Sequence, residues 1–136
     1  MNIIPLTLSE PLVKFLLPFL IGSMVFFAAL VAPNTFQNLN EKDARKFIRS
    51  IFPKLYLWGA ILSFLIAVLI FSMNQFFGFL IFVVFIGFIY SRQFLIKIIN
   101  KSSDDNNSSR FKKLHTFSVI IFFSQLLIMT TINFLV

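Results

Sequence analysis

Side chains able to do acid–base, nucleophilic or metal chemistry are scarce in this sequence. The 136 residues include one histidine, His115, no cysteine and five acidic residues. All five acids lie outside the long apolar segments: Glu10, Glu41, Asp43, Asp104 and Asp105. Paired-carboxylate catalysis needs two acids that face each other, and proton-coupled transport usually uses a buried carboxylate. The sequence therefore predicts no catalytic residue and disfavours an enzyme.

A haem or a metal ion would need ligands that this chain barely supplies. A six-coordinate b-type haem takes two axial ligands from His or Met. Met129 lies fourteen residues beyond His115 on the same predicted helix, about 21 Å away at about 1.5 Å per residue. Met73 is predicted at the opposite membrane face, which leaves Met24 as the least remote partner. We expect no cofactor and no metal, and a haem- or metal-linked redox protein is the weakest alternative.

Polar side chains near one end of the predicted helices form the candidate site. Arg92 is the deepest basic residue of its apolar segment, where it could line a pocket with His115 and Tyr56. The residues proposed for this cytoplasmic-side site are His115, Arg92, Tyr56, Ser118, Pro33 and Phe36. Simpler interpretations stay open, since an arginine stem can lie in apolar surface while its head reaches lipid phosphates. His115 can equally be an interfacial residue that hydrogen-bonds a neighbour or a phosphate.

A third polar set lies within the last apolar segment. Ser118, Gln125 and Asn133 recur at seven and eight residues, which places them on roughly one helix face. This pattern predicts hydrogen bonds between helices rather than a water-lined path.

The elements that carry these side chains follow from composition. Hydrophobic residues make up 58% of the chain, charged residues 12%, and the mean hydropathy is +0.90. Soluble domains average about 45–50% apolar and about 25% charged residues. The 21 Phe residues are more apolar surface than a small water-soluble core can hide. These numbers exclude a soluble enzyme, a disordered chain and a disulfide-rich secreted domain.

Four apolar segments are long enough to cross a bilayer, whose core of about 30 Å needs about 20 apolar residues in a helix. They lie at about residues 12–32, 55–73, 76–96 and 117–136. Each must be helical, because lipid offers backbone groups no hydrogen-bond partner. We therefore predict an all-α fold, an integral membrane four-helix bundle that forms a single membrane domain over residues 1–136. A lone bundle, a homo-oligomer and a complex with a membrane partner all fit this prediction.

The connection between the first two segments is predicted to hold a short basic amphipathic helix at about 41–52. Asn40 can cap it by accepting a hydrogen bond from the backbone N–H of Asp43. Apolar residues recur there at steps of three and four: Ala44, Phe47, Ile48, Ile51 and Phe52. Pro53 is expected to end the helix. Such helices usually lie in the headgroup layer, although this one could instead extend the second span.

The third connection carries the polar run Ser102–Ser109, of eight residues. A run of this composition buries too little apolar area to offset the cost of ordering it. We therefore predict a flexible loop at about 101–110.

Basic residues set the expected orientation. Of the twelve Lys and Arg, Lys14 alone falls on one side of the membrane and the other eleven fall on the opposite side. Because cytoplasmic loops carry the excess of Lys and Arg, both termini should be outside and both long loops cytoplasmic, in the inner membrane of a cell. The expected partner is the bilayer and not a nucleic acid. Anionic headgroups are expected to contact Lys42, Arg45, Lys46, Arg49, Lys54, Lys112 and Lys113.

Three stretches, in order, resemble the domain of unknown function 4149 family, also called the transmembrane protein 205-like family. The first, Gly22 to Leu39, contains an Ala-Pro-x-x-Phe element at Pro33 and Phe36. The second, Asp43 to Gly59, resembles the family's basic segment ending in Phe-Pro-x-x-Tyr. The third, Arg110 to Leu127, resembles its Phe-x-x-Leu-His-x-x-Ser element.

The resemblance implies a four-helix integral membrane protein without a settled biochemical activity. Animal relatives are linked to drug resistance, which suggests transport or trafficking. The sequence is thus interpreted as that of a non-enzymatic four-span membrane protein of unknown substrate. The main alternative is a small membrane transporter or a transporter subunit.

Overall fold

The computed structural model describes residues 5–136, and every regular element in that range is helical. The first long helix joins α1 (Leu6–Phe26), a π-helical turn η1 (Phe27–Val31) and α2 (Ala32–Asn38). It is followed by α3 (Glu41–Phe71). The third joins α4 (Gln75–Tyr90), a second π-helical turn η2 (Ser91–Leu95) and α5 (Ile96–Asp104), and the fourth is α6 (Ser108–Leu135). The predicted all-α four-helix bundle is confirmed.

All four long helices are long and apolar enough to cross a membrane, with lengths of 33, 31, 30 and 28 residues. At about 1.5 Å per residue they measure roughly 42–50 Å, which exceeds the bilayer core of about 30 Å. The chain is therefore a multi-pass membrane protein whose helices extend beyond the apolar core.

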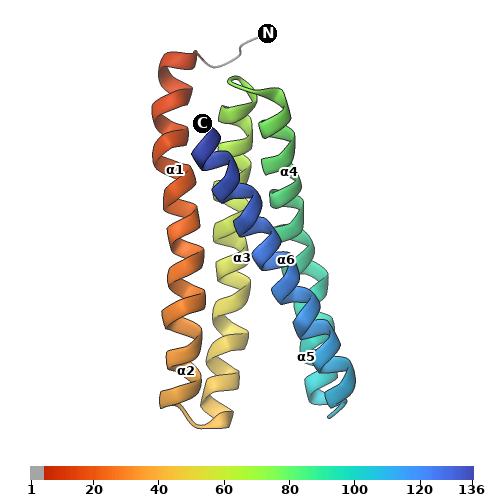
Figure 1. Cartoon of the computed structure of the whole chain (residues 1–136). Coiled ribbons are helices and arrows are strands. Elements are labelled where there is room, and N and C mark those ends of the chain that lie inside the picture. The colour runs from red at the N-terminus through yellow and green to blue at the C-terminus, as the bar shows by residue number, and fades with distance from the viewer. Residues whose placement is uncertain (1–4) are drawn as a thin grey trace.

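The helices run antiparallel to their neighbours in the chain, and α3 packs against both α1 and α4 (Figure 1). Helix α6 crosses the bundle obliquely (Figure 1). It contacts α1 and α4, and it also packs on η2 and α5. The start of α1 and the end of α6 lie at the same end of the molecule (Figure 1).

Close packing between α3 and α4 depends on glycines. A Cβ atom added to Gly59 would lie 2.6 Å from the ring of Phe88, which is fully buried. A Cβ added to Gly78 would lie 2.8 Å from the Cα of Phe71, across the turn that joins the two helices. Small residues let membrane helices approach closely, and these two glycines set the distance between α3 and α4.

The prediction of a separate amphipathic helix at 41–52 is wrong. Helix α3 runs without a break from Glu41 through Pro53 to Phe71, so this segment extends the second span. A proline inside a helix removes one hydrogen bond, but α2 packs along α3 here and Ala44 is buried. The predicted cap is confirmed, because the Asp43 N–H donates to Asn40 Oδ1 at 2.8 Å.

The polar run predicted as a flexible loop is largely helical. Helix α5 continues to Asp104 and α6 begins at Ser108, which leaves a short turn. Asn106 adopts φ 54°, while the N–H of Asn106 donates to Ser103 O and that of Asn107 to Ser102 O. This is the Schellman arrangement that ends helices, with Asn in the left-handed position. The polar residues of this run therefore end α5 and cap α6.

Candidate functional site

Two of the predicted site residues, Tyr56 and Arg92, lie where α3 meets the third long helix. The Tyr56 ring is buried, with its centroid 5.8 Å from that of Phe52 and 6.4 Å from that of Phe88. The Nε–H of Arg92 donates to the carbonyl oxygen of Pro53 at 3.2 Å. The half-buried Arg92 guanidinium is therefore directed onto α3.

The other predicted site residues lie on different surfaces. His115 is exposed and stacks on Phe111 of its own helix, with ring centroids 5.9 Å apart. Ser118 Oγ donates to the His115 carbonyl at 2.7 Å, so this contact also stays within α6. Pro33 and Phe36 are exposed on α2.

The predicted six-residue pocket is thus divided among three places. Within residues 5–136, no hydrogen bond, ion pair or aromatic contact joins His115 to Arg92 or Tyr56. The structure brings Tyr56 and Arg92 to the same pair of helices and separates both from His115.

Two of the long helices are irregular at the level of Arg92. The π-helical turns η1 and η2 close through hydrogen bonds from Ala32 to Phe27 and from Ile96 to Ser91. Pro53 lies between them on α3. The ring centroid of the neighbouring Phe52 is 5.1 Å from that of Phe27. π-Helical turns inside α-helices occur frequently at functional sites. Sequence reasoning did not find these turns; Pro33, two residues after the end of η1, was the one available signal.

A shallow, open basic groove lies along the first turns of α3, and only residues of this helix line it. It has a volume of about 560 Å³ and is lined by Glu41, Lys42, Arg45, Lys46 and Arg49. Arg49 connects α3 to α5, because its Nη2 donates to Asp104 Oδ1 at 2.7 Å and to the Asn100 carbonyl at 3.3 Å. The hydrogen bond from Arg49 holds the pKa of the Asp104 carboxyl below its ordinary value, and the charges of Arg49 and Arg45 act in the same direction.

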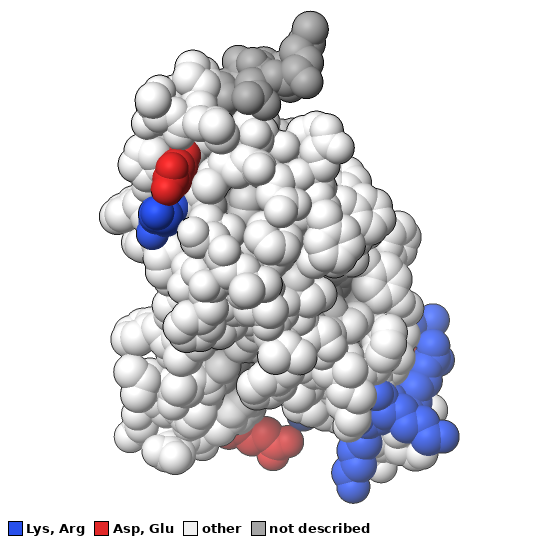
Figure 2. All heavy atoms as spheres, turned by 45° about the horizontal axis from the view of Figure 1, so that its top comes forward, with Lys and Arg blue, Asp and Glu red and all other residues white. Residues whose placement is uncertain are grey.

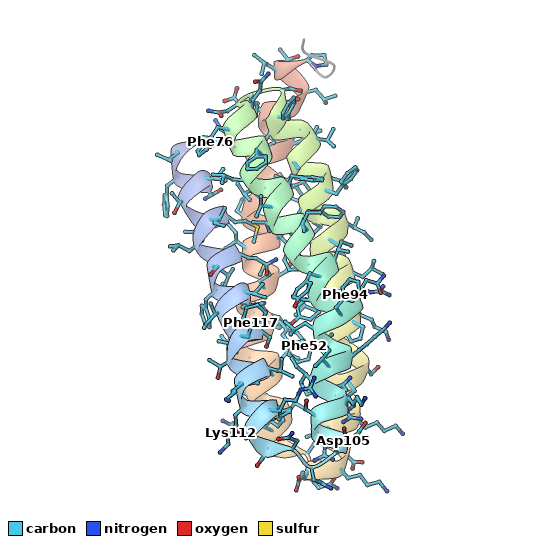
Figure 3. All side chains as sticks on the ribbon, turned by 90° about the vertical axis from the view of Figure 1, so that its right-hand side faces the viewer. Phe52, Phe76, Phe94, Asp105, Lys112 and Phe117 are labelled. Carbon is cyan, nitrogen blue, oxygen red and sulfur yellow. The ribbon has the colours of Figure 1, made fainter. Side chains whose placement is uncertain are left out.

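The basic residues gather at one end of the molecule (Figure 2). At the other end Lys14 pairs with Glu10 at 2.8 Å, so its charge is balanced locally. Lys112 near the start of α6 and Asp105 after α5 lie at the basic end, with Phe76 at the opposite end (Figure 3). The bundle therefore has one strongly cationic end.

The hydrogen bonding between helices that was predicted for one face of α6 is confirmed at Gln125, whereas the Ser118 hydroxyl bonds within α6. The buried Gln125 Nε2 donates to the Val84 carbonyl of α4 at 2.9 Å. A Cβ at Gly87 would lie 2.7 Å from that Nε2, so glycine leaves the room that the amide needs. In the part of the chain that the structure describes, no three His, Asp or Glu residues cluster so as to hold a metal ion.

Comparison with known proteins gives one match. A family model described as "Domain of unknown function (DUF4149)" matches residues 15–108. The matched stretch runs from α1 to the start of α6, and it includes the Arg92–Pro53 contact and the basic groove. No curated protein and no solved structure matches the chain.

Proposed function

The chain belongs to the domain of unknown function 4149 family, and we propose that it binds anionic lipid headgroups in the inner membrane through its cationic end. In this proposal the protein is not an enzyme. Both termini lie outside, and the cationic end faces the cytoplasm. The first turns of α3 stand in the headgroup layer as an extension of the second span.

The observation that carries this proposal is the distribution of charge. Eleven of the twelve basic residues belong to the cationic end, and the twelfth, Lys14, is paired with Glu10. Four of the five acids, Glu41, Asp43, Asp104 and Asp105, lie at the same end, so eleven cations exceed them by seven. Juxtamembrane Lys and Arg gain about 1 kcal/mol each near an anionic leaflet, so a large excess of cations favours the cytoplasmic surface.

A thermal unfolding experiment with added lipid tests the proposal. Purified protein in a neutral detergent is heated with phosphatidylglycerol or with phosphatidylcholine. Phosphatidylglycerol should raise the Tm and phosphatidylcholine should not. The increase should shrink at about 1 M salt, where the screening length falls to about 3 Å. Equal increases with both lipids would reject selective binding of anionic headgroups.

Transport is a second candidate function. It is favoured by the π-helical turns at the level of Arg92. The turns η1 and η2 lie there, and transporters commonly form their substrate sites from helices with irregular or interrupted turns. If these helices open, the amides of Ala32 and Ile96 should exchange with deuterium faster than amides in the regular turns of α3. Equal protection in lipid nanodiscs would remove the support for transport.

A further inference from the structure

Arg92 is a half-buried cation without an anionic partner. Its Nε–H bonds to the Pro53 carbonyl, and within residues 5–136 it takes part in no ion pair. A guanidinium carries five N–H donors, so one bond leaves most of its donor capacity unused. Removing such a charge from water is costly unless an anion and further hydrogen bonds compensate.

Two more arginines lie on the same side of α3. Arg49 is four residues from Pro53, about 6 Å along the helix axis, and Arg45 is one further turn away. We call Arg45, Arg49 and Arg92 the arginine cluster; their guanidiniums have different partners and follow one another in a row along the helices. Arg49 pairs with Asp104, whereas Arg45 pairs only with Glu41 at 3.2 Å, and the Glu41 side chain is 88% exposed. An exposed pair of this kind contributes little.

The arginine cluster lies where a phospholipid headgroup would be. Arg92 follows a long apolar stretch of the third helix, so it marks the inner edge of the headgroup layer. On the apolar side of the cluster Leu57 of α3 is exposed, which offers apolar surface to acyl chains. Arginine binds phosphate through two parallel hydrogen bonds, and basic pockets between membrane helices bind phospholipid headgroups.

We propose that the arginine cluster, together with Lys46, forms a specific site for the headgroup of an anionic phospholipid, with Arg92 as the deepest contact, to the phosphate. This site refines the proposed function, because it localises headgroup binding to one place between α3 and the third long helix. Diffuse attraction to the whole cationic end would instead use every basic residue about equally.

Lipid binding to single variants distinguishes the specific site from diffuse attraction. Phosphatidylglycerol retained by the purified protein is titrated by native mass spectrometry. Arg92→Gln should weaken binding about tenfold, the equivalent of about 1.4 kcal/mol. Lys112→Gln, which removes one charge at the same end on α6, is the matched control and should change binding less than about twofold.

Arg45→Gln keeps the test decisive if Arg92→Gln fails to fold. Arg45 is half exposed and its one partner is a neighbour in its own helix, so this variant should fold normally. It should weaken phosphatidylglycerol binding at least about threefold, within the range expected for a lost charge-assisted hydrogen bond. A twofold or smaller effect of Arg45→Gln, matching Lys112→Gln, would overturn the specific site.

Further outcomes separate the levels of the proposal. If all three variants lose binding equally, the specific site is wrong while headgroup binding by the cationic end stands. If wild-type protein binds phosphatidylglycerol no better than phosphatidylcholine, both proposals fail. Inorganic phosphate at millimolar concentration should not displace the lipid; displacement would identify the site as one for free phosphate.

Discussion

The apolar part of the bundle and its cationic end are held together by different contacts. In the apolar part, α3 and α4 meet at Gly59 and Gly78, and a buried amide joins α6 to α4. At the cationic end, α3 meets α5 through the partly exposed Arg49–Asp104 pair. Buried packing in the first region fixes the fold, whereas the second region keeps unpaired cations at its surface.

This difference indicates a division of roles. Overpacking a buried helix contact costs about 1–3 kcal/mol, but exposed ion pairs are worth about 0–1 kcal/mol. Basic side chains at the cationic end therefore add little to stability and remain free to bind anions. Substitutions in the two regions should differ accordingly.

Among these substitutions, Gly78→Ala should reduce the free energy of unfolding most. The new Cβ would meet the backbone of Phe71 at 2.8 Å, and backbone cannot move aside cheaply. The loss should be about 1–3 kcal/mol in a mixed-micelle unfolding titration. Gly22→Ala is the control, because nothing lies within 4 Å of its Cβ position; it should be neutral or stabilise by up to about 1 kcal/mol. Equal effects would show that the close approach of α3 and α4 is not limiting.

Gln125→Leu should have the next largest effect. It removes the hydrogen bond to Val84, and such contacts between membrane helices are worth about 0.6–2 kcal/mol. The same substitution at the exposed Gln93 should change stability by less than about 0.5 kcal/mol. The same titration measures both, and a stable Gln125→Leu protein would argue against the buried amide as a fixed contact.

Asn107→Ala should cost about 1 kcal/mol. Asn107 caps α6 by accepting a hydrogen bond from the Arg110 N–H at 3.1 Å. Asn106→Gly is the matched control and should not reduce stability, because glycine adopts the left-handed conformation readily. A loop that is truly flexible would tolerate both variants equally well.

Acidification should have the smallest effect. Because Arg49 lowers the pKa of Asp104 below its ordinary 3.8, the pair stabilises the fold above that pH. The contribution is lost as pH falls through the lowered pKa. The Tm difference between wild type and Asp104→Asn should thus be small at pH 7 and should close in acid.

Periodicity and apolar length predicted the four spans, the Asn40 cap and the Gln125 contact, because each depends on residues close in sequence or on one helix face. Three features required the fold. Pro53 was expected to end a helix, yet α3 continues through it, with Phe52 packed on Phe27 and the Pro53 carbonyl bonded to Arg92. The run Ser102–Ser109 was read as a loop by composition, although its polar residues act as caps. His115 and Arg92 were grouped by depth alone, and depth does not fix which way a helix faces.

The orientation of the cationic end is the central claim, and single-cysteine labelling tests it most directly. The chain contains no cysteine, so Thr7→Cys and Ser108→Cys each introduce one exposed thiol at opposite ends. A membrane-impermeant maleimide should label Thr7→Cys in intact cells, and it should label Ser108→Cys only after the membrane is opened. Labelling of Ser108→Cys in intact cells, with Thr7→Cys protected, would contradict the account.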